Sequence, residues 1–153
     1  MTPLSDYFPD ELQFSRFKEK IEIGSVIRYF VNDTTPPKIK IMIVIGKSSD
    51  ALTIVTVYVN SELNTNVFRN KTMQDLQILL KKENCEYLQH DSYVDCSALH
   101  VKQLDNLKQK FDAAELGSLG KVSSEDLNLI KGKLIRTGTI PLKQKKEYGL
   151  IKV

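Results

Sequence analysis

Three apolar segments rich in β-branched residues follow one another in the first half of the chain, joined only by short polar links. They read SVIRYFV (25–31), KIKIMIVI (38–45) and LTIVTVYV (52–59). β-Branched and aromatic residues favour strands, whereas the linking stretches NDTTPP and GKSSDA are rich in turn-forming residues. Because the links are tight, the segments predict an antiparallel meander at the centre of the fold.

Helical periodicity dominates the rest of the chain. Apolar residues three or four apart predict a helix within the first twenty residues, a second over 73–80 and a third over 101–111. A fourth begins after a serine cap at Ser123 or Ser124. Strands that precede most of the helices, instead of alternating with them, predict an α+β fold. We expect a small, strongly curved antiparallel sheet closed as a barrel, with helices packed outside.

The length of 153 residues and the hydrophobic fraction of 41% predict one domain with a substantial core. We expect it to span 1–138, with the Lys-rich stretch 139–153 as a basic tail that is more typical of solvated surface than of a binding patch. No apolar run is long enough to cross a bilayer and no secretory signal is visible, so the cytoplasm is the expected compartment. The spacing of Cys85 and Cys96 is not that of a zinc site, and we expect neither a metal nor a cofactor.

The stretch HDSYVDCS, which begins at His90, concentrates side chains that serve in hydrolase sites. His90 could act as a general acid or base, with Asp91 or Asp95 orienting it. The same stretch can instead form a strand in which Val94 and Cys96 point inward. Its composition favours the strand.

Lys40 is a second candidate, because it lies off the apolar face formed by Ile39, Ile41 and Ile43. It is either a rim lysine that points into water or a cation held on a rigid strand to meet phosphate. The net charge of +3 allows nucleic-acid binding without demanding it. The motifs GxxxxGK[ST], GxGxxG and GxSxG are absent, so nothing predicts a phosphate loop or a nucleophile elbow.

A series of short motifs is found between residues 22 and 135: EIGSVIRYFV, KIKIMIVIGK, LTIVTVYVNSE, SYVDCSALHVKQLD and LGSLGKVSSEDLNLI. Their order resembles the PemK/MazF-like toxins of type II toxin–antitoxin systems. Members of this family are small SH3-like barrels that usually dimerise, and many are endoribonucleases held inactive by an antitoxin peptide. The resemblance therefore implies an SH3-like barrel, single-stranded RNA as substrate, an antitoxin protein as partner and a homodimer.

The chain departs from the family pattern at the positions that the resemblance assigns to the site. An Arg-Pro of the family is replaced by Lys40-Ile41, and the family's Thr or Ser after the third strand is matched by Ser61. In VDCSA, Asp95 and Ser97 stand where relatives carry an arginine and an aspartate. A lysine replaces the charge of an arginine but not its bidentate fork, and Asp95 reverses the charge near the phosphate.

We therefore expect a rearranged site that cuts RNA without a metal, with the 2′-hydroxyl of the RNA as the nucleophile. The candidate catalytic residues are Lys40, Ser61, His90 and Asp95, with His100 as an alternative group for proton transfer. The candidate RNA-binding residues, which would meet phosphate or stack on bases, are Arg28, Tyr29, Tyr58 and Tyr93.

Two other functions stay open at this point. The missing Arg-Pro and the charge of Asp95 favour a non-catalytic interaction module that keeps the barrel and has lost the family's catalytic residues. A small-molecule hydrolase built on His90 and Asp91 is the least supported, because no nucleophile motif accompanies these residues.

Overall fold

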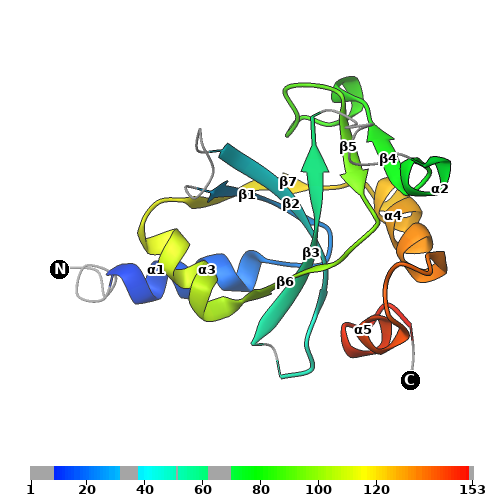
Figure 1. The fold of residues 1–153 in the computed structure, drawn as a ribbon. Coiled ribbons are helices and arrows are strands. Elements are labelled where there is room, and N and C mark those ends of the chain that lie inside the picture. Colours follow the sequence, from blue (N-terminus) through cyan, green and yellow to red (C-terminus); the bar gives the residue numbers. More distant parts are fainter. Residues whose placement is uncertain (1–8, 32–37, 51, 62–69, 152–153) are drawn as a thin grey trace.

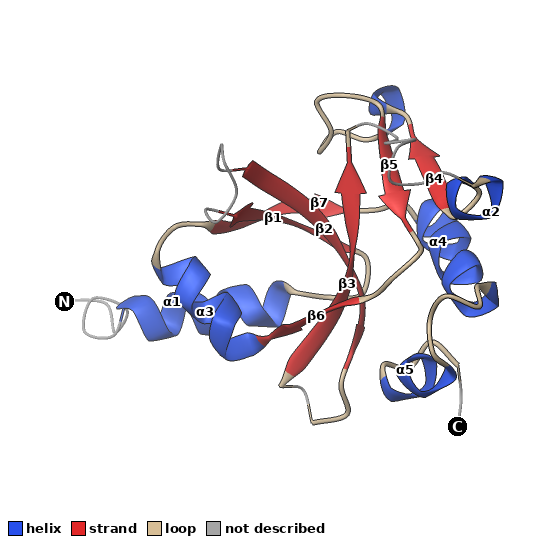
Figure 2. Ribbon diagram, in the orientation of Figure 1, coloured by secondary structure: helices blue, strands red, loops and turns tan. Residues whose placement is uncertain are grey.

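The computed structural model describes residues 9–31, 38–50, 52–61 and 70–151. It contains a seven-stranded antiparallel sheet with helices on both sides (Figures 1 and 2). The strands are β1 (Ser25–Val31), β2 (Lys38–Lys47), β3 (Thr53–Asn60), β4 (Gln77–Leu80), β5 (Ser92–Asp95), β6 (His100–Gln103) and β7 (Leu116–Lys121). The α-helices are α1 (Pro9–Lys20), α2 (Lys71–Gln74), α3 (Leu104–Asp112), α4 (Ser124–Arg136) and α5 (Leu142–Glu147), and η2 (Lys82–Asn84) is a short 3₁₀ helix.

The predicted meander forms the centre of the sheet, since β1 pairs with β2 and β2 with β3, both antiparallel. The full order is β4-β5-β3-β2-β1-β7, and β6 pairs with β3 beside β5. The α+β class, the antiparallel sheet and the outer helices are therefore confirmed. Among the described residues no pairing joins β4 to β7, so the sheet is open and is not the closed, strongly curved barrel that we expected. The physical reason is that one edge of β3 pairs with two short strands, β5 along one part and β6 along another. Within the described ranges neither of them continues the sheet to β7.

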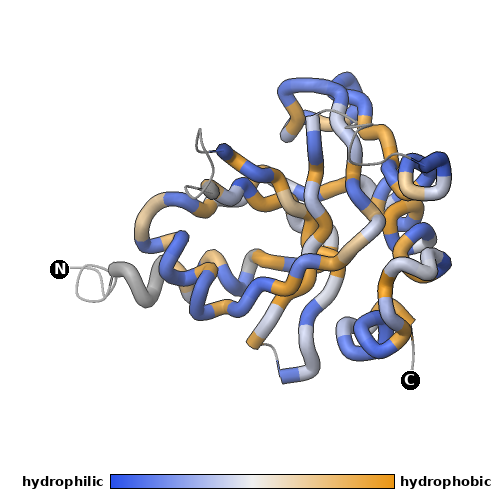
Figure 3. The backbone as a smooth tube through the Cα atoms, viewed as in Figure 1, coloured by the Kyte–Doolittle hydropathy of each residue, from blue (hydrophilic) through white to orange (hydrophobic). Residues whose placement is uncertain are grey.

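The two faces of the sheet pack against different helices. One face, the α4 face, buries Ile43 and Val57 against Ile130 and Leu134 of α4. The other, the α3 face, buries residues such as Met42 and Val44 against Phe14 of α1 and Leu107 of α3. Hydrophobic residues are frequent along the central strands, whereas hydrophilic and hydrophobic residues are mixed along helices such as α4 (Figure 3). Because β2 is covered on both sides, it needs the nearly continuous apolar run that the sequence shows.

The helix predicted over 73–80 is wrong. The chain forms a single helical turn, α2, and then the strand β4, in which Ile78 pairs with Val94. Leu76, Ile78 and Leu80 also alternate at a spacing of two, and pairing with β5 selects this period over the helical one. The stretch 117–124, which leads to the predicted serine cap, begins with most of β7.

The basic stretch that begins at residue 139 packs against the core as far as residue 151. Ile140 and Tyr148 are buried in the cluster of the α4 face. Lys145 of α5 is only 8% exposed, and its Nζ donates to the carbonyl oxygens of Ile135 at 2.8 Å and Thr137 at 2.7 Å. These carbonyls lie at the C-terminal end of α4, where unpaired acceptors are left by the helix. The ammonium therefore ties α5 to the end of α4.

Candidate nucleic-acid interface

A cluster of polar and aromatic side chains lies on the α3 face, beyond the part that α1 and α3 cover. Strand alternation and register place its members on the same side of β1, β2, β3 and β6. We call this cluster the cationic patch, and it consists of Tyr29, Lys40, Tyr58, Asn60, His100 and Lys102.

Lys40 lies next to Tyr29 across the β1–β2 ladder. Its Nζ donates to Oδ1 of Asn60 at 3.3 Å and lies 5.8 Å from the centre of the Tyr58 ring. Among the described residues no carboxylate forms an ion pair with Lys40. The charge is therefore held in place by a neutral amide and remains available to an anion.

Tyr58 and His100 form a parallel stack with ring centres 3.7 Å apart and planes 2° apart. Lys102, two residues along β6 on the same side, donates from Nζ to the Tyr58 hydroxyl at 2.8 Å. The stack fixes the orientation of the imidazole, and one face of Tyr58 is already occupied by His100.

The pKa of His100 is lowered from its ordinary value, first because the ring is half-buried and then because Lys102 lies close by. Asp95 acts in the opposite direction and Lys40 again lowers the pKa. Burial and positive neighbours both disfavour the imidazolium ion. His100 is thus kept as the neutral imidazole, the form that can accept a proton at neutral pH.

Tyr29 connects the cationic patch to helix α3. Two ammonium groups lie near its ring: Lys102 Nζ at 5.1 Å and Lys110 Nζ at 5.4 Å from the ring centre. These are cation–π distances. Tyr29 therefore links Lys102 of the cationic patch to Lys110 of α3.

The candidate residues from the stretch 90–97 behave differently. His90 is exposed in the turn before β5, and its carbonyl oxygen accepts from the Ser92 hydroxyl. Asp95 is half-buried and accepts from Gln77, from the backbone N–H of Ser97 at 2.9 Å and from the Ser97 hydroxyl. The strand interpretation is confirmed, with Val94 and Cys96 fully buried.

The other candidates divide between the two faces. Tyr93 pairs with Asn60 across β3 and β5 and thus lies on the side of the cationic patch, and Ser61 is exposed directly after Asn60. Arg28 pairs with Ile41, so it lies on the opposite face of the sheet from Lys40. Its guanidinium lies against Gly117, which has no side chain. A Cβ at residue 117 would lie 3.3 Å from Nη2 of Arg28.

Sequence reasoning missed Asn60 and Lys102. Asn60 is two residues after Tyr58, and Lys102 is two residues after His100, so each shares a side with a residue that was considered. The spacing could have identified Asn60, because β3 was predicted. The segment containing Lys102 was taken as helix, where that alternation does not apply.

The cationic patch offers an unpaired ammonium, a neutral imidazole and aromatic rings on one surface. Ammonium groups and aromatic rings are the side chains that single-stranded nucleic acids bind through phosphate and base stacking. Among the described residues no group of three or more His, Cys, Asp or Glu side chains comes together to hold a metal ion. None of the described helices is long and apolar enough to cross a membrane.

Comparison by sequence finds neither a matching protein-family model nor a similar curated protein. Comparison by structure finds similarity to a chain in the crystal structure of MazE-MazF (Form III) from Deinococcus radiodurans. The TM-score is 0.51 at 9% sequence identity, and the match covers 74% of this chain and 92% of that chain. The fold is therefore a MazF/PemK-like fold, as the resemblance of the sequence motifs implied.

Proposed function

We propose, from the MazF-like fold and the cationic patch on it, that the protein binds single-stranded RNA and cleaves it through the substrate's 2′-hydroxyl. The observation that carries this proposal is the unpaired ammonium of Lys40, held by Asn60 beside the Tyr58–His100 stack. An RNA strand supplies phosphates to meet the ammonium and bases to lie against the aromatic rings.

Each group of the proposed site has a chemical role. The 2′-oxygen attacks phosphorus and the bond to the 5′-oxygen breaks, which leaves a 2′,3′-cyclic phosphate and a 5′-hydroxyl. Neutral His100 accepts the proton of the 2′-hydroxyl, and the departing 5′-oxygen takes a proton from a water molecule to become the 5′-hydroxyl. Lys40 stabilises the extra negative charge on the phosphorane, and Asn60 positions Lys40. Ser61 and Asp95 border this site, and the reaction needs no metal in this scheme.

The proposal extends to partners and to location. The structurally similar chain belongs to a MazE-MazF crystal structure, which supports an antitoxin protein as partner for this chain. We propose that an antitoxin segment with acidic or apolar residues covers the cationic patch and so competes with RNA. The family resemblance further supports a homodimer and a cytoplasmic location, where messenger RNA is the available substrate.

The test is incubation of the purified protein with a long single-stranded RNA in the presence of a metal chelator. We expect cleavage by the wild type and a loss of about hundredfold or more for Lys40→Ala, because a cation at the transition state is removed. Lys143→Ala is the matched control, since Lys143 is an exposed lysine on α5. Intact RNA from a folded wild-type protein would contradict the ribonuclease proposal.

A second candidate function is a non-catalytic interaction module. Asp95 favours it, because a carboxylate tied to Gln77 and Ser97 lies on the side of the sheet where phosphate would approach. Such a module would bind the antitoxin or RNA through the cationic patch without cleavage. Binding that Lys40→Ala weakens, together with intact RNA, would support this function over the first.

A further inference from the structure

A cleft beside the cationic patch is lined by residues of α3, β1 and the turn before β7. Its volume is about 360 Å³, and its lining consists of Tyr29, Asn106, Gln109, Lys110 and Glu115. This volume is within the range of small-ligand sites. Tyr29 belongs both to the cleft and to the cationic patch, so the cleft and Lys40 lie side by side.

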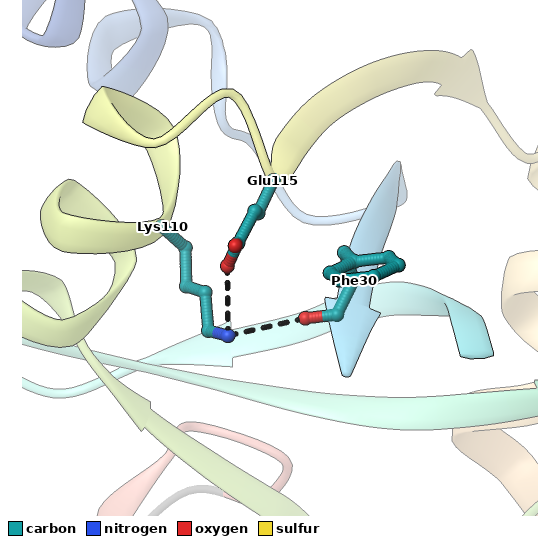
Figure 4. Close-up of polar contacts among 3 residues, drawn as sticks. All are labelled: Phe30, Lys110 and Glu115. Atoms are coloured by element: carbon teal, nitrogen blue, oxygen red, sulfur yellow. Dashed lines mark hydrogen bonds and ion pairs between the residues drawn. The ribbon is translucent and has the colours of Figure 1, made fainter. Parts of the chain in front are cut away.

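Hydrogen bonds join the residues at the floor of the cleft, and the charges of Lys110 and Glu115 compensate each other. Lys110 Nζ donates to Glu115 Oε2 at 3.0 Å and to the carbonyl oxygen of Phe30 at 3.2 Å (Figure 4). The backbone of the same residues is also joined, since the N–H of Glu115 donates to Lys110 and that of Phe30 to Glu115. Ala114 makes this turn possible with a left-handed φ of 59°. These bonds join the end of α3 to β1 at the base of the cleft.

Two amide side chains provide the hydrogen-bonding groups of the cleft. Asn106 and Gln109 are exposed, lie three residues apart on α3 and so share one side of the helix. Neither amide is hydrogen-bonded to any of the residues that the structure describes. Each offers an acceptor oxygen and two N–H donors to whatever enters the cleft.

This lining suits a flat, neutral ligand better than an anion. The carboxylate of Glu115 repels a phosphate, and the Lys110 charge that could attract one is already bonded to it. A nucleobase is neutral and presents hydrogen-bond donors and acceptors on its edge, which the two amide side chains complement.

We propose that this cleft binds one nucleobase of the RNA strand and that Asn106 and Gln109 read its edge, a proposal that rests on the proposed function. The phosphate contacts of the cationic patch hold the strand without regard to sequence. The cleft then determines the base preferred at one fixed position near the cut.

The experiment compares cut sites in a pool of random single-stranded RNA, identified by sequencing the cleavage ends. We expect the wild type to prefer one base at a fixed position by about tenfold or more. The double variant Asn106→Leu, Gln109→Leu should reduce that preference to about twofold, because cleavage at sites with the preferred base falls towards that at other sites while the cationic patch still holds the strand. Asn128→Leu, an exposed asparagine on α4, is the matched control and should keep the wild-type preference.

The outcomes separate this proposal from the proposed function. If the double variant cleaves with an unchanged base preference, or the wild type cleaves with no preference, the proposal that the cleft binds a base is wrong. The proposal that the protein is a ribonuclease would still stand. RNA that the wild type leaves uncut would contradict the ribonuclease. In that case the side-chain amide NMR signals of Asn106 and Gln109 decide: selective shifts on adding an RNA oligonucleotide support base binding, and unchanged signals overturn it.

Discussion

Two polar regions of this molecule each contain a histidine, and the fold uses them in opposite ways. In the stretch 90–97 the polar groups bond to nearby chain: Asp91 accepts from the backbone N–H of Lys82, and Asp95 from that of Ser97. In the cationic patch, residues from separate strands meet, as in the stacking of Tyr58 on His100. The polar residues of the first region are adjacent in the sequence. Those of the second region come together only in the folded structure.

The difference teaches how a site is recognised. In the stretch 90–97 the carboxylates already accept from backbone N–H groups and side chains of the same stretch and of the adjoining β4 and η2, so little of their hydrogen-bonding capacity is left for a ligand. Side chains that meet from distant strands are held in place by the sheet. Their charges and hydrogen-bonding groups remain available to a ligand. The charge on Lys40 and the neutral ring of His100 are such functions.

The largest expected effect comes from reversing charge in the cationic patch. We predict that Lys40→Glu combined with Lys102→Glu weakens binding of a single-stranded RNA by about hundredfold or more at low salt, because phosphates then meet carboxylates. The matched control, Lys143→Glu combined with Lys146→Glu on α5, changes net charge equally. It should weaken binding by less than about tenfold. Fluorescence anisotropy titrations measure both affinities. Equal losses of affinity in the two double variants would contradict RNA binding at the cationic patch.

The next effect concerns stability away from the cationic patch. Lys145→Ala should lower the free energy of unfolding by about 1–3 kcal/mol, because two carbonyl acceptors at the end of α4 lose their donor. Lys146→Ala, one residue along on the exposed side of α5, should change it by less than about 0.5 kcal/mol. Urea denaturation measures both, and equal values would show that the buried ammonium does not secure α5.

The pH dependence of cleavage sharpens the role of His100. Its pKa is lowered because burial and the neighbouring Lys102 and Lys40 outweigh Asp95, so neutral imidazole persists below the ordinary value of 6.5. We predict that kcat/KM declines as the pH falls, with a midpoint below 6.5, because His100 then takes up a proton. A decline with its midpoint above 6.5 would show that another group is the base.

The smallest effect concerns the turn that shapes the cleft. Ala114 has a φ of 59°, a conformation that glycine adopts without the cost of a side chain. Ala114→Gly should therefore stabilise the protein by about 0.5–1 kcal/mol. Ala113→Gly, at a φ of −83°, should destabilise it by a similar amount. Thermal unfolding compares the two, and the same sign for both would contradict this view of the turn.

The sequence alone predicts the parts of the fold that are determined locally. The strands around Ile27, Ile43 and Val57 follow from β-branched runs, and Ser123 caps α4 as expected, accepting from the N–H of Asp126 at 3.1 Å. The strand β4 was missed because its partner, β5, lies elsewhere in the chain and overrides the helical spacing at Leu76 and Leu80.

The candidate site was predictable only in part, and for the same reason. Lys40 and Tyr58 were identified because both lie on strands that the sequence predicts. The pairing of β6 with β3, which brings His100 beside Tyr58, depends on the tertiary fold. Composition therefore drew attention to His90, whereas the sheet brings His100 to Lys40.

The most direct measurement of this account compares the two histidines in one RNA cleavage assay. We predict that His100→Gln lowers the cleavage rate by about hundredfold or more, as expected for loss of a general base, while His90→Gln stays within about twofold of the wild type. Thermal unfolding of both variants controls for folding. Loss of cleavage in His90→Gln with normal activity in His100→Gln would contradict the account, because the stretch 90–97 would then carry the chemistry.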